Sequence, residues 1–341
     1  MLNNKISSIE LVRFLAALSV VIYHYHYVFN DFNQLTVEEL PFFSFLSVFY
    51  KYGTYAVHIF FTISGFIFSY VYLSKKNIKA KEFFINRFAR LYPLHFITLL
   101  AVVFLSLANT EFSNYFINAF IPIYTDLYHF ILQLLFVSYW GLQKGFSFNT
   151  PSWSISIEIL MYIVFFLSAK NLNKHKVTLP ISIILFFLIS YKFTNFFNFD
   201  EYALLFFSGV LIYQITKFKR SNLLISANFL ILIFSFIGNF KILLFCPSFL
   251  ILLIYLDKLI KNNKISGLFN FFGGLSYSIY MTHFPLMVLF LLFEHLAIIN
   301  EKFYFSNYFF FFFNFLIIFI SIISFKFYEY PLNKKIRKIF L

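Results

Sequence analysis

Apolar runs of about 15 to 22 residues recur along the whole chain, separated by short polar or basic connections. A helix rises about 1.5 Å per residue, so each run approaches the thickness of a bilayer hydrocarbon core, which is about 30 Å. We therefore predict an all-α, polytopic membrane helix bundle of about ten transmembrane helices. The predicted spans are 8–28, 55–73, 92–108, 152–168, 178–191, 202–216, 222–237, 242–256, 274–296 and 307–328.

An eleventh candidate, 116–140, decides the topology. It is interrupted by Pro122, Asp126, His129 and Gln133. Without it, 20 of the 27 Lys and Arg residues fall at the termini and in alternate connections, and five fall in the others. Positive residues favour the cytoplasmic side, which predicts cytoplasmic termini and an outer loop over 109–151 with a re-entrant or surface-lying segment. Eleven spans are the alternative, and they place the basic loop 169–177 on the outside.

Composition supports the membrane assignment. The chain is 61% hydrophobic and 12% charged, against about 25% charged residues in soluble domains, which excludes soluble, disordered and disulfide-framed classes. Cys246 is the single cysteine, so it cannot form an internal disulfide. No stretch outside the spans is long enough for a soluble core, so we expect one membrane-embedded domain over 1–341, without an appended soluble domain. The net charge of +13 is mostly an orientation signal, and it does not indicate nucleic-acid binding.

Ionisable residues inside the spans are candidates for chemistry, because each costs about 2.5 to 3.5 kcal/mol at the bilayer centre. Arg13 and His24 are eleven residues apart, about three helical turns, so they share one face of the first span. Glu10 lies on the same side. The alternative for His24 is a neutral, hydrogen-bonded structural imidazole.

The fourth span carries a second polar face. Trp153 lies at its start, and Ser154, Glu158 and Tyr162 follow one another at intervals of four, so these three line one side of the helix. We expect Glu158 at a depth similar to that of His24. A structural glutamate, hydrogen-bonded across the bundle, is the alternative.

Four further residues are candidates by position. His58 and Ser64 lie in the second span, at or just below the predicted outer level. His283 lies two residues before Pro285, whose missing N–H leaves a backbone carbonyl free. A kinked polar core without chemistry fits these residues equally well. Glu329 closes the last predicted span, where a cap or a lysine pair is the simpler explanation.

The basic segment before the third span holds two arginines. Arg87 and Arg90 are three residues apart and therefore neighbours on a helix, where two guanidinium groups can bind phosphate. An ordinary positive loop on anionic lipid is the alternative. The chain contains no HExxH, Gly-rich phosphate loop or GxSxG motif, so we expect no metal.

Six segments together resemble the acyltransferase 3 family of integral membrane acyltransferases. They are ELVRFLAALSVVIYH (10–24), AVHIFFTISGF (56–66), FFINRFARLYP (83–93), WSISIE (153–158), GLSYSIYMTHFP (274–285) and YEYP (328–331). The resemblance implies ten helices in the cytoplasmic membrane and transfer of an acyl group, usually acetyl from acetyl-CoA. The acceptor that the resemblance implies is a hydroxyl of a cell-envelope polysaccharide, another carbohydrate or a glycolipid. Membrane lipid and glycan-assembly proteins are the implied partners.

The resemblance also implies roles for single residues. His24 matches the catalytic base, Arg87 and Arg90 match the donor site, and Arg13 matches an essential basic position. His58 stands where an acidic residue is common in the family, so the acceptor and the acyl chain stay open.

Two mechanisms and a second function follow from the same residues. His24 either deprotonates an acceptor hydroxyl, with Arg13 or His283 stabilising the oxyanion, or carries the acyl group itself. A transporter or flippase for a glycan or a lipid-linked precursor would use the same polar face. The side of the membrane on which transfer occurs and the oligomeric state also stay open.

Overall fold

The computed structural model describes residues 6–29, 36–75, 77–108, 124–194, 199–217, 231, 235, 241–260 and 263–341. Within these ranges the secondary structure is helical, with one isolated bridge between Tyr124 and Ser147 and no strand. The predicted all-α fold is therefore confirmed for the described chain.

The helices follow one another with short connections. They are α1 (Ser7–Phe29), α2 (Phe43–Tyr52), α3 (Ala56–Tyr72), α4 (Ala80–Leu107), α6 (Leu127–Leu134), α7 (Ser152–Lys174), α8 (Thr178–Ile189), α9 (Asp200–Thr216), α11 (Lys241–Asp257), α12 (Asn263–His295), α13 (Asn307–Ile323) and α14 (Tyr330–Phe340). Shorter turns are η2 (Val37–Glu39), η3 (Gly53–Tyr55) and η5 (Glu301–Phe305), and π-helical turns are η4 (Ser190–Thr194) and η6 (Ser324–Glu329).

Six helical stretches of the described chain are long and apolar enough to cross a membrane. They are Ser7–Phe29, Phe43–Tyr72, Ala80–Leu107, Ser152–Lys174, Asn263–His295 and Asn307–Phe340. Helices α8, α9 and α11 occupy three more predicted spans but have only 12, 17 and 17 residues. The predicted span 222–237 lies almost entirely outside the described residues. Six spans are thus supported, and the total of ten and the orientation of the termini stay predictions.

The described part of the eleventh candidate does not span. Helix α6 has eight residues and is about 12 Å long. It ends at Leu134, and Phe136 has a positive φ of 60°. This part of the segment is therefore too short for the hydrocarbon core, as expected of a re-entrant or surface-lying element. Residues 116–123 of the candidate lie outside the described chain.

The chain divides into two compact units, which are described separately. The first comprises Met1–Phe14, Tyr55–Ala80 and Ile157–Gly273. The second comprises Leu15–Thr54, Lys81–Ser156 and Gly274–Leu341. The expectation of one embedded domain over the whole chain stays a prediction.

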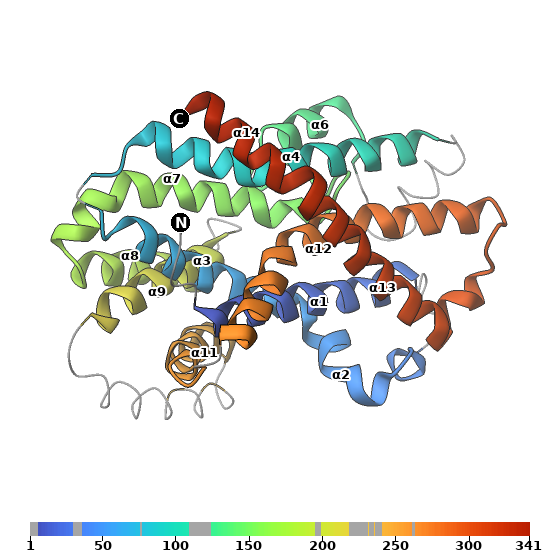
Figure 1. The fold of residues 1–341 in the computed structure, drawn as a ribbon, viewed down its shortest axis with the longest axis horizontal. Coiled ribbons are helices and arrows are strands. Elements are labelled where there is room, and N and C mark those ends of the chain that lie inside the picture. Colours follow the sequence, from blue (N-terminus) through green and yellow to red (C-terminus); the bar gives the residue numbers. More distant parts are fainter. Residues whose placement is uncertain are drawn as a thin grey trace. The chain divides into compact units, whose positions relative to one another are not determined.

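In the first unit, α9 packs against α3, α8 and α11 (Figure 1). Two glycines allow α3 and α9 to touch along their backbones. A Cβ atom on Gly65 would lie 1.8 Å from the Phe206 carbonyl oxygen, and one on Gly209 would lie 2.0 Å from the Thr62 carbonyl oxygen. Small residues permit such close approach between membrane helices, so these two positions set the distance between α3 and α9.

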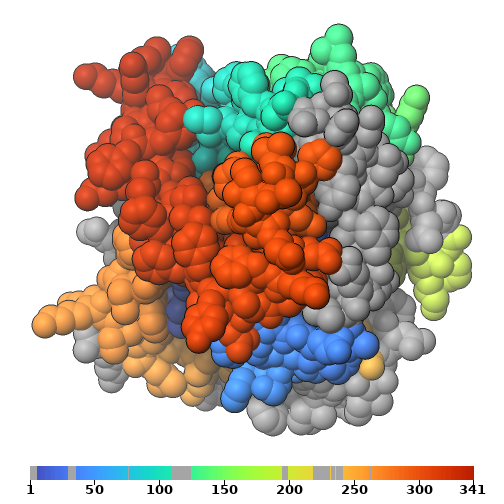
Figure 2. Space-filling view, turned by 90° about the vertical axis from the view of Figure 1, so that its right-hand side faces the viewer, coloured from blue at the N-terminus to red at the C-terminus, as the bar shows by residue number. Residues whose placement is uncertain are grey.

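In the second unit, α13 has one buried and one exposed face. Phe309 and Phe313 are fully buried, and both rings pack on Tyr25 of α1. Tyr308 and Phe315 are 84% and 68% exposed on the opposite side. The orange to red part of the chain occupies much of the surface in Figure 2. A helix with an apolar face of this kind exposed suits contact with lipid chains.

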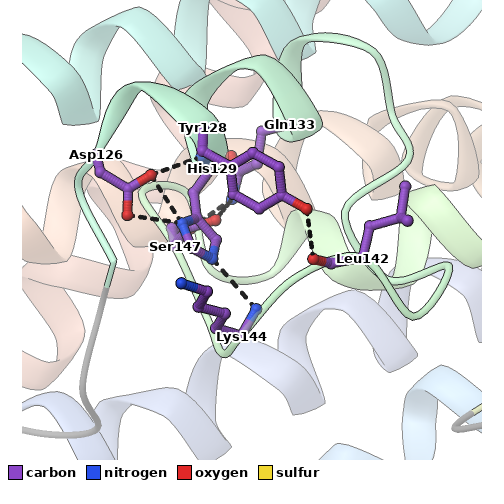
Figure 3. Close-up of polar contacts among 7 residues, drawn as sticks. All are labelled: Asp126, Tyr128, His129, Gln133, Leu142, Lys144 and Ser147. Carbon is purple, nitrogen blue, oxygen red and sulfur yellow. Dashed lines mark hydrogen bonds and ion pairs between the residues drawn. The ribbon is translucent and has the colours of Figure 1, made fainter.

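A clamp of polar contacts holds the segment after α6 against that helix (Figure 3). His129 of α6 is buried, and its Nδ1 lies 2.8 and 2.9 Å from the two carboxylate oxygens of Asp126. A carboxylate accepts, so Nδ1 donates and the other ring nitrogen, Nε2, accepts the Lys144 backbone N–H at 3.2 Å. Tyr128 donates from its hydroxyl to the Leu142 carbonyl oxygen.

Replacing Asp126 with alanine is expected to loosen this segment. Asp126 also accepts the His129 backbone N–H as the N-cap of α6. Loss of such a cap costs about 1 kcal/mol, which corresponds to about fivefold faster exchange of the amides that the contacts protect. Hydrogen exchange at the Lys144 amide measures the effect. The Lys144→Ala variant is the matched control, because it keeps the backbone amide and is expected to exchange as the parent does.

The clamp is also expected to depend on pH. Burial alone raises the pKa of Asp126, but the hydrogen bonds donated by the His129 backbone and ring outweigh it and hold that pKa below 3.8. The carboxylate therefore stabilises the fold at pH values above 3.8, and this contribution is lost as the pH falls through the lowered pKa. If the Lys144 amide exchanged at the same rate in Asp126→Ala as in the parent protein at neutral pH, these polar contacts would not hold the segment.

Candidate active site

Two histidines meet in the second unit. His283 of α12 is completely buried, and its Nε2 lies 3.2 Å from Nδ1 of His24 on α1. Their ring centroids are 5.1 Å apart and the rings are tilted by 30°. His24 is only partly buried, so this ring keeps some exposure beside its buried partner. The structure thus brings together two of the predicted catalytic residues, which are 259 positions apart in the sequence.

The hydrogen bonds fix where the protons lie on this pair. Nδ1 of His283 lies 3.2 Å from the Ile279 carbonyl oxygen, which can only accept, so Nδ1 carries the proton. Nε2 of a neutral His283 then accepts, and His24 must donate to it from Nδ1. This leaves a lone pair on Nε2 of His24. The arrangement can take up a proton at His24 and share the resulting charge with His283.

A proline beside the histidine pair opens α12 to a side-chain donor. Pro285 has no N–H, so it cannot bond the Met281 carbonyl four residues earlier. Asn149 donates from its Nδ2 to this carbonyl oxygen, at 3.4 Å. The free carbonyl expected near Pro285 is therefore that of Met281, and Asn149 satisfies it. Sequence reasoning did not single out Asn149.

The start of α7 is tied to α12 through Tyr280. Its hydroxyl donates to the Pro151 carbonyl oxygen at 2.9 Å and lies 2.7 Å from Oγ of Ser154. The Tyr280 ring contacts that of His283, with centroids 5.9 Å apart. Trp153 is partly exposed next to Ser154 and packs on Tyr139, with centroids 5.1 Å apart.

Glu329 is buried and bonded to serines. Its Oε1 accepts Ser278 Oγ at 2.5 Å and Ser324 Oγ at 3.0 Å, and the helix continues past it into α14. Of the two simpler explanations, the lysine pair is therefore wrong, because serine hydroxyls are the partners of Oε1. Glu329 ends the π-helical turn η6, and such turns occur often at functional sites. The positive charge of Arg90 also acts on this carboxyl group.

Arg87 and Arg90 lie on one helix, α4, as their spacing predicts. The Arg90 guanidinium carbon lies 6.0 Å from the ring centroid of Tyr277, a cation–π contact. The Tyr277 hydroxyl donates to the Leu91 carbonyl oxygen at 2.6 Å, which fixes this ring beside the arginine. Both arginines are partly buried, and Arg90 lies beside Tyr277 of α12.

Glu158 has its polar contacts within the first unit. Its Oε1 accepts Ser64 Oγ at 2.8 Å and the hydroxyl of Tyr162, one turn further along α7. The Tyr162 ring stacks on Phe68 with centroids 4.1 Å apart. Two predicted site residues, Glu158 and Ser64, are therefore in direct contact.

An ion pair and a histidine–carboxylate contact also lie in the first unit. Arg13 Nη1 lies 3.1 Å from Glu10 Oε2, so these two predicted residues also meet. Nε2 of His58 lies 3.3 Å from Oε1 of Glu201, at the start of α9. Glu201 was missed in the sequence. The signal that could have found it is an acidic residue directly before an apolar span, where an intramembrane histidine needs a partner.

The predicted site residues thus fall into two sets. The second unit contains His24, Arg87, Arg90, Trp153, His283 and Glu329. The first unit contains Glu10, Arg13, His58, Ser64 and Glu158. Action of both sets at one site stays a prediction. Among the described residues, no group of three or more His, Cys, Asp and Glu side chains could hold a metal ion.

Comparisons with known proteins identify the family of this chain. The chain matches the sequence profile of the acyltransferase 3 family, described as an acyltransferase domain, over residues 6–327. Acyltransferase MdmB from Streptomyces mycarofaciens is 30% identical over 115 residues, which cover 33% of this chain and 27% of that protein. No solved structure matches the chain. Because the profile covers nearly the whole sequence, the chain belongs to the acyltransferase 3 family.

Proposed function

We propose that the protein is an acyltransferase of the cytoplasmic membrane that moves an acetyl group from acetyl-CoA to a hydroxyl of a cell-envelope polysaccharide or related carbohydrate. The observation that carries the proposal is the His24–His283 pair, which leaves a lone pair on Nε2 of the partly exposed histidine. Family membership and six candidate spans support the same activity in a membrane.

The reaction uses His24 as a general base. Its Nε2 takes the proton of the acceptor hydroxyl while the oxygen attacks the thioester carbonyl carbon. The carbon–sulfur bond then breaks, the ester is formed, and the CoA thiolate leaves with the proton from His24. His283 accepts the hydrogen bond from Nδ1 of His24 throughout, which orients the ring and spreads the positive charge of the intermediate state.

Arg87 and Arg90 are proposed to hold the donor. CoA carries phosphates, and neighbouring guanidinium groups bind phosphate through paired hydrogen bonds. The two arginines are neighbours on α4, and Tyr277 supports Arg90. The proposal places the thioester end of the donor toward His283, which lies six residues after Tyr277 on α12.

Replacing either Arg87 or Arg90 with alanine is expected to raise KM for acetyl-CoA by about 10- to 100-fold, because each loses a charged hydrogen bond worth about 1.5 to 3 kcal/mol. KM for the acceptor should not change. Steady-state kinetics in detergent micelles measures both constants. Lys81→Ala, an exposed change on the same helix, is the control.

A thioester assay tests the proposed activity. The acceptor is a pool of oligosaccharides, released by mild acid from the polysaccharide of the cells that make the protein and freed of esters by mild base. Purified protein should release CoA thiol from acetyl-CoA only when this acceptor pool is present. A carrier would bind or move the pool without releasing thiol, and that result would overturn the proposal.

A further inference from the structure

A ring of buried polar side chains lies in the second unit, outside the histidine pair. His95 and Thr98 come from α4, Gln133 from α6, and Ser147 and Asn149 from the segment before α7; each is at most 5% exposed. His95 Nε2 lies 2.9 Å from the Gln133 carbonyl oxygen, and Gln133 Nε2 lies 3.0 Å from Ser147 Oγ. Asn149 Nδ2 lies 3.1 Å from Thr98 Oγ1, and Thr98 Oγ1 donates to the His95 carbonyl oxygen at 3.0 Å, which leads back to His95.

Three members of this polar ring keep an acceptor atom without a partner. His95 donates from Nε2 to a carbonyl, so its Nδ1 has a lone pair, and this atom has no hydrogen bond. Gln133 and Asn149 use their amide nitrogens as donors, and their oxygens Oε1 and Oδ1 have no partner. The orientation of each side chain is therefore fixed by its donor contacts, and what is missing is a donor.

The polar ring adjoins the histidine pair through the backbone of α12. Asn149 donates to the Met281 carbonyl oxygen, two residues before His283. The chain continues from Asn149 to two more hydroxyls without partners, those of Thr150 and Ser152. The Tyr280 hydroxyl, bonded to the Pro151 carbonyl oxygen, links this stretch to the turn that precedes His283.

The three acceptor atoms without partners limit which class of ligand can bind. A buried acceptor without a donor costs about 1 to 3 kcal/mol, so an apolar ligand gains nothing here. Ca²⁺ and Mg²⁺ favour carboxylate ligands, and none of the five ring members is a carboxylate. Transition metals favour clustered His and Cys ligands, and His95 is the one such residue among the five. An anionic group on a sugar adds acceptor atoms and no donor, so it cannot satisfy these atoms. Several uncharged hydroxyl groups, as on a neutral sugar, supply the missing donors.

We propose that His95, Gln133 and Asn149 bind hydroxyl groups of an uncharged sugar unit of the acceptor, beside the histidine pair. The inference rests on the proposed acyltransferase function and adds the acceptor-binding residues and the class of sugar. Binding by these side chains would hold the sugar while a further hydroxyl meets His24.

The two tryptophans of the chain offer a direct readout of binding. Trp140 and Trp153 flank Asn149 in the sequence, and Trp140 Nε1 donates to the Ser156 carbonyl oxygen at 2.8 Å. Titrating purified protein with the acceptor pool, without acetyl-CoA, should give a saturable change in tryptophan fluorescence. A pool fraction of neutral oligosaccharides should bind, and a fraction of acidic ones should bind at least tenfold more weakly.

Substitutions of similar shape test the acceptor atoms. Asn149→Leu and Gln133→Met are each expected to weaken binding of the neutral fraction at least tenfold and to raise its KM, with KM for acetyl-CoA unchanged. Asn314→Leu on α13 and Gln143→Met in the segment after α6 are the matched controls and should bind as the parent does. Should Asn149→Leu not fold, Gln133→Met decides alone.

The outcomes separate this inference from the proposed function. Parental affinity in both variants would overturn it and would mean that water alone satisfies these atoms. Preference for the acidic fraction would also overturn it. A protein that binds the neutral fraction through Asn149 and Gln133 but never releases CoA thiol would contradict the proposed function and keep the sugar site.

Discussion

Replacing His24 with alanine is expected to lower the rate of acyl transfer by about 10² to 10⁴-fold, the usual contribution of a general base. The variant loses the Nε2 lone pair that takes the acceptor proton, whereas the donor contacts of Arg87 and Arg90 stay in place. KM for acetyl-CoA should therefore change little while kcat falls. Thiol release and ester formation, measured on the purified variant, give both constants.

Two other histidines provide a control and a second variant for this prediction. His26→Ala is the control, because His26 lies two residues further along α1 and has no role in the proposed transfer; it should retain parental activity. His283→Ala removes the acceptor of the Nδ1 proton and should reduce kcat by about 10- to 100-fold, less than the loss of His24. Equal activity of His24→Ala and the parent would exclude His24 as the base.

Replacing Gly65 with alanine is expected to disrupt the first unit. The added Cβ would lie 1.8 Å from the Phe206 carbonyl oxygen, and backbone cannot move aside as a flexible side chain can. Overpacking of this kind costs about 1 to 3 kcal/mol where side chains yield, and more is expected where α3 and α9 must separate. The melting temperature in detergent and the yield of monodisperse protein measure the loss.

Gly267 provides a matched control for this prediction. It lies in α12, and a Cβ atom there meets nothing within 4 Å. Gly267→Ala should leave the protein as stable as the parent or more stable by up to about 1 kcal/mol, because alanine favours a helix. A Gly65→Ala variant that melts at the parental temperature would show that α3 and α9 do not touch as described.

The helices that carry the chemistry could be predicted from the sequence. The apolar period places His24 in α1 and His283 in a long span near Pro285. The spacing of Arg87 and Arg90 makes them neighbours on one helix, as the structure shows. Helix ends were less predictable. Helix α4 begins at Ala80, not at residue 92, because its first turns are basic and amphipathic and do not read as an apolar run.

Side-chain partners from distant segments could not be read from spacing. Nothing in the sequence joins His24 to His283 or His58 to Glu201, because tertiary packing of separate helices decides such pairs. A cap or a lysine pair was the simpler explanation for Glu329, but a buried carboxylate can also be satisfied by serine hydroxyls on neighbouring turns. Asn149 could have been found by asking which donor satisfies the carbonyl that Pro285 leaves free.

The most direct test of the account follows the acyl group itself. The protein in lipid vesicles is given acetyl-CoA labelled with ¹³C at the carbonyl carbon, together with the ester-free acceptor pool. NMR of the recovered oligosaccharides should show a labelled acetyl ester with the parent protein and none above background with His24→Ala. Label that stays on CoA with the parent, or that reaches the sugar equally with both proteins, would contradict transfer through His24.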